Sequence, residues 1–263
     1  MEWKKIRSWL IVMVLAVDLF LAGNLLVQGL SVRQNERQAA QDAVTVAHSR
    51  GIEISLEAVL RLPEEMSLWQ AQRSEQLEGA AAQALLGTVQ LENPGGGVAI
   101  YNGENGQVLF RRGGALELAG PWTADGDWYQ ACLDRLEGAG FSTADALVRQ
   151  AEEQLELTQQ FEGYPIYNSV LTCRYADGRL QLSGRWMLAE EPSAVENGLG
   201  RAQLVLALCD LLESQQTTLQ DLQAGYCLYS EDGQSLMLEP VWAVETTQGR
   251  LLISCISGQL LNF

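Results

Sequence analysis

The stretch PIYNSVLTCRYADGRLQLSGRWM, from Pro165 to Met187, decides the fold class of this chain. Two runs rich in β-branched, aromatic and aliphatic residues flank Asp177-Gly178, a pair that favours the tight turn of a β-hairpin. Turns this short join neighbouring strands directly and leave no room for a parallel crossover. The stretch therefore predicts antiparallel sheet.

The same order of a helix followed by hairpins recurs on both sides of this stretch, which predicts an α+β fold of antiparallel meanders backed by helices. Ser142 or Thr143 is a candidate cap for the helix that is expected to run to about Gln159. Helices are predicted over residues 74–86, 127–136, 143–159 and 200–213. Strands are predicted over residues 51–55, 88–91, 165–175, 179–187, 225–230, 235–245 and 250–255, with a further hairpin around Asn105-Gly106.

The beginning of the chain carries an apolar run, Trp9 to Val27, which is long enough to cross a bilayer once. Because Lys4, Lys5 and Arg7 precede the run, the positive-inside rule keeps the N-terminus in the cytoplasm. We therefore expect a single-pass protein of the cell membrane with an extracellular C-terminal domain. The alternative is a cleaved secretory signal, but the apolar run is long and Leu21-Ala22-Gly23-Asn24 is a poor cleavage site.

Asp18 breaks the apolar pattern near the middle of the predicted transmembrane helix, where an ionisable side chain is costly. One interpretation is that Asp18 faces another transmembrane helix; the other is that it stays protonated in a tilted or locally hydrated helix. Helical spacing places the following residues on the face of Asp18, and they are the predicted partner-binding residues: Val14, Leu15, Leu21, Ala22 and Leu25.

The domain organisation follows from these segments. We expect a cytoplasmic tail, a transmembrane helix, a membrane-proximal helix that can transmit rotation or tilt, and three extracellular α+β units. The expected ranges, in that order, are residues 1–8, 9–28, 29–50, 51–125, 126–190 and 191–263.

The composition limits the partners of the outer part. The chain has 263 residues and a net charge of −16, and no lysine follows Lys5. An acidic surface of this kind excludes nucleic acid as a partner, since nucleic acid binding needs basic patches. Solubility is a sufficient explanation for the charge.

Five cysteines are scattered along the outer part without a C-x-x-C pair, so the sequence predicts no metal site. Buried free thiols are favoured over a disulfide framework, because most of these cysteines have apolar neighbours. The cysteines are Cys132, Cys173, Cys209, Cys227 and Cys255.

Three short motifs resemble those of the YycI family. They are Met1 to Arg7 directly before the apolar run, Phe161-Glu-Gly-Tyr-Pro-Ile-Tyr-Asn168 with Gly184-Arg-Trp186, and Glu239-Pro-Val-Trp-Ala-Val244. The resemblance covers nearly the whole chain in layout. The chain departs from the family in Asp18, where an Asn is typical, and in the lack of lysine in its outer part.

The resemblance implies a function and partners. YycI and its sister YycH are membrane-anchored regulators of the WalK sensor histidine kinase in Firmicutes, a kinase of cell-wall homeostasis. Their extracellular domains consist of tandem α+β units distantly similar to PepSY modules, and they are not enzymes. The expected partners are therefore a sensor histidine kinase and a YycH-type regulator, while the direction of regulation stays open.

Catalysis is not expected from the residues either. The single histidine, His48, lies in the membrane-proximal helix, far from any cleft of the outer domain. Adjacent acids such as Glu64-Glu65, Glu152-Glu153 and Glu190-Glu191 point apart and are typical of solvated surface. We expect no catalytic residue, no cofactor and no metal.

The alternative function is that of an anchored PepSY-like module that binds a peptide or inhibits a peptidase through a groove or a sheet edge. Aromatic residues of the predicted strands could line such a groove, although strand aromatics more often belong to a core. These residues are Tyr164, Tyr167, Trp186, Tyr226, Tyr229 and Trp242.

Overall fold

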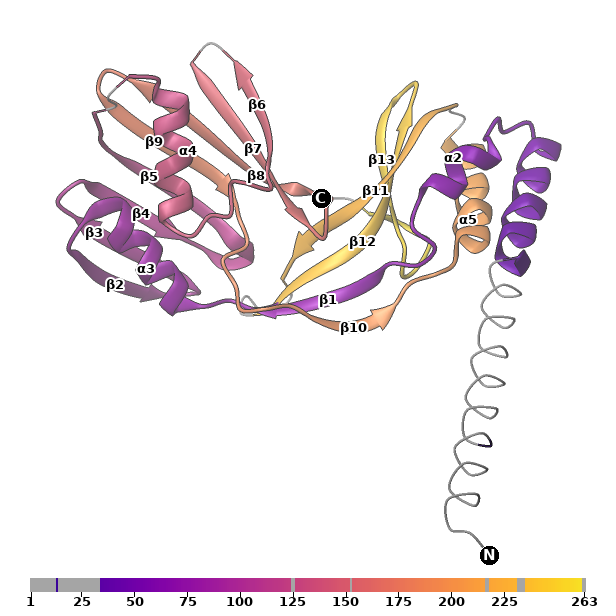
Figure 1. Cartoon of the computed structure of the whole chain (residues 1–263), viewed down its shortest axis with the longest axis horizontal. Helices are drawn as coiled ribbons and strands as arrows, with labels where there is room; N and C mark the ends of the chain where they lie inside the picture. Colours follow the sequence, from indigo (N-terminus) through magenta and orange to yellow (C-terminus); the bar gives the residue numbers. More distant parts are fainter. Residues whose placement is uncertain are drawn as a thin grey trace, which may run out of the picture.

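The computed structural model describes residues 13, 34–123, 126–151, 153–215, 218–230 and 235–261. These residues form a mixed α+β fold with one continuous 14-stranded sheet and few helices, as the hairpin pattern predicts. The sheet is divided into two lobes (Figure 1). The middle lobe comprises residues 75–188, and the terminal lobe is built from residues 34–72 and 193–261.

The middle lobe is a twisted sheet with two helices on one face (Figure 1). Its strands follow the order β6-β7-β8-β9-β5-β4-β3-β2, and every neighbouring pair is antiparallel. The elements are α3 (Glu75–Leu86), β2 (Val89–Gly95), β3 (Val98–Gly103), β4 (Gly106–Phe110), the 3-10 turn η1 (Arg112–Gly114), β5 (Ala115–Pro121), α4 (Trp128–Gly138), β6 (Leu147–Ala151), β7 (Gln154–Phe161), β8 (Tyr164–Ala176) and β9 (Arg179–Arg185).

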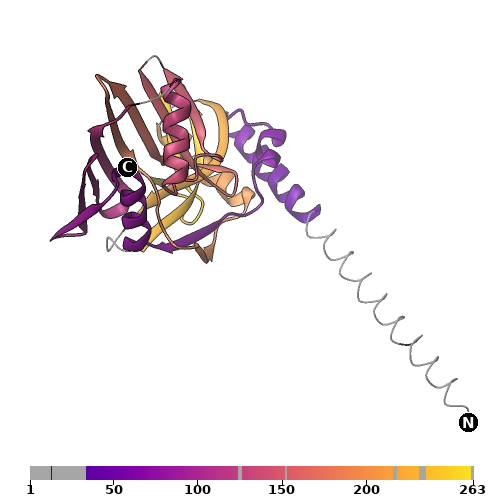
Figure 2. The same cartoon turned by 60° about the vertical axis from the view of Figure 1, so that its left-hand side comes forward.

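The terminal lobe combines both ends of the described chain. A helix over residues 34–49 lies beside α2 and α5, and the strands follow the order β10-β1-β12-β11, with β13 and β14 continuing from β12 (Figures 1 and 2). The other elements are α2 (Leu56–Arg61), β1 (Ser67–Gln72), β10 (Ser193–Asn197), α5 (Arg201–Gln215), β11 (Leu219–Tyr229), β12 (Ser235–Thr246), β13 (Gly249–Ser254) and β14 (Leu260–Leu261).

Each lobe has its own hydrophobic core. In the middle lobe, Leu85 and Leu136 of the two helices are buried against strand residues such as Leu157 and Leu182. In the terminal lobe, the core extends from the 34–49 helix through α5 to Trp242 of β12. The expected division into units 51–125, 126–190 and 191–263 stays a prediction, and the observed cores draw residues from more than one of these ranges.

Local signals place several elements as predicted. Ser74 accepts a hydrogen bond from Leu77 N (3.3 Å) and begins α3, and Asp127 accepts one from Tyr129 N (3.0 Å) and begins α4. These caps satisfy backbone N–H groups that a helix start leaves unpaired. The helix expected over residues 200–213 is α5.

The decisive hairpin is also confirmed, since β8 and β9 are joined by Asp177-Gly178. Both turn residues have positive φ, 53° and 69°. That is the requirement of the two-residue turn whose twist matches the flanking strands.

The helix predicted over residues 143–159 is wrong, because the structure has β6 and β7 there. Leu155 and Leu157 are buried while Gln154 and Glu156 are only partly covered, which is the period of a strand. The expected cap residue Thr143 instead donates its hydroxyl to Glu137 Oε2 (2.7 Å).

Two further predictions are corrected. Residues 51–55 form a turn and a loop and do not form a strand, although Ile54 is buried in the terminal core. The sheet is not wholly antiparallel, since β11 and β8 meet in a parallel contact with Tyr226 opposite Ile166. This contact joins strands that are distant in sequence, so no turn motif between them predicts their pairing.

The predicted tail, residues 1–8, and the predicted transmembrane helix, residues 9–28, lie outside the described residues except for Met13. Within the described ranges, none of the helices has the length and apolar character needed to span a membrane.

Candidate functional site

The joint between the two lobes is built on Asn168 of β8. Its side-chain amide makes the hydrogen bonds that the backbone of a neighbouring strand would make. Oδ1 accepts a hydrogen bond from Leu228 N (2.7 Å), and Nδ2 donates one to Leu228 O (2.9 Å). Leu228 of β11 is fully buried, so both backbone groups need a partner. Asn168 therefore replaces the backbone pairing that two diverging strands can no longer make.

Neighbouring side chains reinforce this joint. Arg185 Nη1 donates to the same carbonyl, Leu228 O (3.1 Å), and the Tyr167 hydroxyl donates to Ala224 O (3.4 Å). The strands approach closely at Gly225, where a Cβ would lie 2.4 Å from the Tyr167 ring and 2.6 Å from Pro165 O. Glycine at position 225 is thus a steric requirement of the joint.

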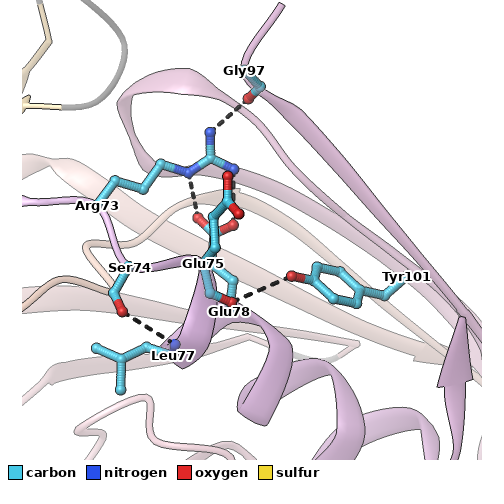
Figure 3. A network of polar contacts seen from close by, with 7 residues as sticks. All are labelled: Arg73, Ser74, Glu75, Leu77, Glu78, Gly97 and Tyr101. Atoms are coloured by element: carbon cyan, nitrogen blue, oxygen red, sulfur yellow. Dashed lines mark hydrogen bonds and ion pairs between the residues drawn. The ribbon is translucent and has the colours of Figure 1, made fainter. Parts of the chain in front are cut away.

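A buried ion pair makes a second connection between the lobes (Figure 3). Arg73 follows β1, and its guanidinium donates to both carboxylate oxygens of Glu78 in α3 (2.5 and 2.8 Å) and to Gly97 O (2.6 Å). The two side chains are 9% and 4% exposed. Burial raises the pKa of Glu78 above its usual range, and the Arg73 guanidinium opposes this increase.

A chain of aromatic rings crosses the same region. Trp69 of β1 meets Phe161 edge-on at 5.3 Å, Phe161 meets Tyr226 at 5.4 Å, and Tyr226 meets Tyr164 at 6.4 Å between ring centroids. Edge-to-face contacts of this kind add to the burial of the rings. Burial raises the pKa of Tyr226 to about 12.

The two sequence motifs that lie in the described residues meet at this joint, while Met1 to Arg7 lies outside them. Residues 161–168 supply Phe161, Ile166 and Asn168, and residues 184–186 supply Arg185. In the third motif Pro240 pairs with Tyr226, and Glu239 accepts a hydrogen bond from Ser254 Oγ (2.5 Å). Segments about 80 residues apart in sequence thus form one structural unit.

The aromatic residues that were candidates for a groove divide into two groups. Trp186, Tyr226 and Trp242 are at most 2% exposed and belong to the cores. Tyr164, Tyr167 and Tyr229 are half-buried. The Arg250 guanidinium lies over the Tyr167 ring, 5.1 Å from its centroid.

The helix of residues 34–49 is an integral part of the terminal lobe. It buries Ala40, Ala43, Val44 and Ala47, which recur at the spacing of one helical face. These small side chains share a core with residues of α5, including Leu208. The helix is therefore fixed to the lobe by packing and does not stand apart as a free rod.

Polar contacts hold the C-terminal end of this helix against its neighbours. The Arg50 guanidinium pairs with Asp210 (2.5 Å) and Glu213 (3.8 Å) of α5. Nε2 of His48 lies 2.8 Å from Ile54 O, so the single histidine holds the loop that follows the helix. At the start of α5, Arg201 donates to the carbonyl of Leu62, directly after α2.

The predicted partner-binding residues lie outside the described residues, so the structure does not test them: Val14, Leu15, Asp18, Leu21, Ala22 and Leu25. The five cysteines are all free and buried, as the apolar neighbours of four of them predict. Within the described ranges, no group of three or more metal-ligating side chains occurs.

Sequence reasoning missed Arg73, Asn168 and Arg50 as connecting residues. Their partners lie 5 to 160 positions away, and nothing in the local pattern shows which residues those partners are. One signal was available for Asn168: a polar residue near the middle of an apolar strand needs a partner of its own.

No family model matches the chain, and none of the curated proteins matches it. Among solved structures, 11 chains match. An uncharacterized protein from Eubacterium rectale is similar with 9% identity over 76% of this chain and 87% of its own, at a TM-score of 0.42. The Bacillus megaterium YpeB C-terminal domain matches with 11% identity over 73% of this chain and all of its own length (TM-score 0.34).

YycH from Bacillus subtilis matches with 15% identity over 75% of this chain, at a TM-score of 0.38. The match covers 54% of the YycH chain, so this chain corresponds to about half of it.

Proposed function

We propose that this chain is a membrane-anchored regulatory protein of the YycI and YycH type, which modulates a sensor histidine kinase through contacts of its transmembrane helix and outer domain. The sequence motifs support this proposal through their resemblance to that family. The predicted location is the cell membrane, with the N-terminus in the cytoplasm and residues 29–263 outside. The proposal assigns no reaction to the protein and requires no catalytic group.

The structural observation that supports the proposal most is the docking of the 34–49 helix. This helix begins six residues after the predicted transmembrane segment, residues 9–28, and its inner face is buried in the terminal core. Because Arg50 also anchors its end to Asp210 and Glu213, a rotation or tilt of the outer domain must move the helix with it. A regulator that acts across a membrane needs such a rigid connection.

Regulation then requires only that the chain binds two signalling conformations of the kinase with different affinity. A partner helix that contacts one signalling conformation of the kinase better than the other shifts the equilibrium by that difference in free energy, and by no more. Asp18 is the residue proposed to make the contact specific, because a polar group in a bilayer gains most from a polar partner.

The test is to co-express the full chain with the sensor kinase of its own genome and to purify the kinase from solubilised membranes. We expect the chain to co-purify, and Asp18→Leu to reduce the recovered amount severalfold. Phe20→Leu is the matched control, since helical spacing puts Phe20 on the opposite face. Failure to co-purify would reject the proposal, and full recovery of Asp18→Leu would reject the role of Asp18.

A second candidate function is that of a module that binds an extended peptide or inhibits a peptidase. The observation that favours it is the presence of open sheet edges. Among the described residues, β10 pairs only with β1 and β6 pairs only with β7, and all residues of both strands are exposed. Edge strands can accept an additional strand from a partner.

Replacing the predicted transmembrane helix distinguishes between the two candidate functions. Residues 9–27 are replaced by an unrelated single-pass helix of the same length, and the effect on kinase phosphorylation is measured in membranes. Regulation through helix pairing predicts that the effect is lost. An effect that survives the exchange would favour the peptide-binding module.

A further inference from the structure

Strand β6 forms an outer edge of the middle lobe, and its free side is open (Figure 1). Among the described residues, β6 pairs only with β7, and no backbone group from elsewhere bonds to residues 147–151. Every second residue of such a strand directs its N–H and C=O groups away from its one neighbour. The Tyr129 hydroxyl of α4 donates to Ala151 O (2.7 Å) and holds the end of the strand, which leaves residues 147–150 for an incoming chain.

Three other strands, β2, β10 and β14, also pair with a single neighbour in the described part of the chain, but each is protected. β2 contains Pro94, and both β2 and β10 pair with their neighbours through a shift in register. β14 has two residues. Proline, irregular register and short length are means by which proteins prevent pairing at sheet edges. β6 has none of them, because its five residues pair with β7 in continuous register.

Apolar side chains occupy both faces of β6. Leu147 and Val148 are 50% and 49% exposed. Val148 stands opposite Leu157, which is fully buried under the helices, so Val148 lies at the margin of the middle core. Leu147 stands opposite Thr158 on the uncovered face. A strand added to the free side of β6 covers both of these apolar side chains.

One cation marks the middle of the strand. The side chain of Arg149 is 82% exposed, and its Nε lies 3.6 Å from Oε2 of Glu156 on β7. A carboxylate added on the free side of Arg149 extends this pair to a row of acid, arginine and acid across three strands, and opposite charges on facing strands stabilise a sheet. Glu152 and Glu153 follow the strand in the sequence, so an acid is favoured opposite Arg149 and disfavoured nearer the turn.

We propose that the β6 edge binds an extended peptide segment by strand addition, and that this segment carries an acid flanked by apolar residues. The acid pairs with Arg149 on the uncovered face, and the flanking residues pack beside Val148 and Gln150 on the face that the helices cover. A second copy of this chain fits less well, because its own β6 offers an arginine in place of the acid and each copy has a net charge of −16. The inference rests on the second candidate function, for which it specifies the edge and the sequence preference, and it does not depend on kinase regulation.

The test titrates the full chain in detergent micelles with the acetylated and amidated peptide STVEVTS by isothermal calorimetry. This sequence reads the same in both directions, so its central acid can stand opposite Arg149 in a parallel or an antiparallel arrangement. We expect a dissociation constant of about 1 mM or tighter, together with slower hydrogen exchange of the amides of residues 147–151. The peptide STVKVTS, which has a central lysine, should bind about fivefold more weakly.

Two substitutions on β6 locate the site. Arg149→Glu should reverse the preference, so that STVKVTS binds this variant more tightly than STVEVTS does. Val148→Lys places a charge beside the incoming apolar residue and should weaken the binding of STVEVTS. Val195→Lys is the matched control, since Val195 is a valine of similar exposure (54%) on the edge strand β10, and it should leave binding unchanged. Thermal unfolding checks that the three variants are folded.

The proposal is wrong if STVEVTS does not bind at about 10 mM, or if Arg149→Glu keeps the preference for the acidic peptide. It is also wrong if Val195→Lys weakens binding and Val148→Lys does not, because the site would then be β10. Sedimentation of the full chain without peptide tests the second copy as occupant. Self-association that Val148→Lys abolishes would assign the edge to a second copy and overturn the proposal. None of these results bears on co-purification with the kinase, so the two proposals can fail separately.

Discussion

At the scale of single residues, the lobes are connected by a few buried polar groups whose removal has calculable consequences. Arg73 is the clearest case, since its guanidinium is shared between the Glu78 carboxylate and the carbonyl of Gly97. Removing one partner of a buried pair leaves an uncompensated charge. We expect Arg73→Met to lower the free energy of unfolding by about 3 to 5 kcal/mol at neutral pH, measured by urea denaturation.

This loss should depend on pH. Burial already raises the pKa of Glu78, and without Arg73 the pKa rises further. A raised pKa favours folding at low pH, and this stability is lost as the pH rises through the folded-state pKa. The difference between Arg73→Met and the unaltered chain should therefore shrink on acidification. A difference that stays constant from neutral pH to the acidic range would show that Glu78 carries no charge in the folded protein.

The amide of Asn168 provides the second prediction at this scale. Asn168→Leu leaves the buried N–H of Leu228 without its acceptor, whereas Leu228 O keeps the bond from Arg185. One buried backbone group without a hydrogen-bond partner lowers the free energy of unfolding by about 1 to 3 kcal/mol, and urea denaturation should show a loss of this size. Asn197→Leu, which changes an exposed amide at the end of β10, is the control and should cost much less. Equal losses would contradict the role of Asn168 in the joint.

At the scale of elements, the sequence predicted most of the local structure and missed what depends on distant partners. The helices predicted over residues 74–86 and 127–136 and the hairpin at Asp177-Gly178 depend on interactions within a few residues, such as the caps that the structure shows at Ser74 and Asp127. The helix predicted over residues 143–159 rests on Ser142 or Thr143 as a candidate cap, and the structure has strands there. β7 is a strand there because it pairs with β6 and β8 and buries alternate residues such as Leu155 and Leu157.

The 34–49 helix is the element whose rigidity the proposed function needs, and its helical phase can be tested. Insertions between Arg37 and Gln38 leave the buried face from Ala40 onward intact. Two alanines turn the preceding segment by about 200°, and four turn it by about 400°, which is within about 40° of the original phase. We expect modulation of kinase autophosphorylation to be lost with two alanines and largely kept with four.

This pair of variants distinguishes the effect of helical phase from the effect of helix length. The insertion of four alanines raises the domain more, by about 6 Å, although it nearly restores the original phase. A steady decline from two to four alanines would indicate that height above the membrane matters and that rotation does not.

At the scale of the whole molecule, the structure is two cores joined through a parallel strand contact, side-chain hydrogen bonds, an ion pair and a chain of aromatic rings. The α+β class followed from turns and periodicity. The joint did not, because Ile166 and Tyr226 are 60 positions apart and their pairing leaves no pattern in either strand. The two motifs that fall in the described residues, 161–168 with 184–186 and 239–244, lie at this joint, so their residues serve its architecture.

The central claim is that the predicted transmembrane helix pairs with a kinase helix through the face of Asp18. Photo-crosslinking in intact membranes tests it most directly, with the crosslinking amino acid placed in turn at Leu21, Leu25, Ala16 and Phe20 of the full chain. The account predicts crosslinks to the sensor kinase from Leu21 and Leu25, which share the face of Asp18, and little from Ala16 and Phe20 on the opposite face. Equal crosslinking from all four positions, or none from any, would contradict it.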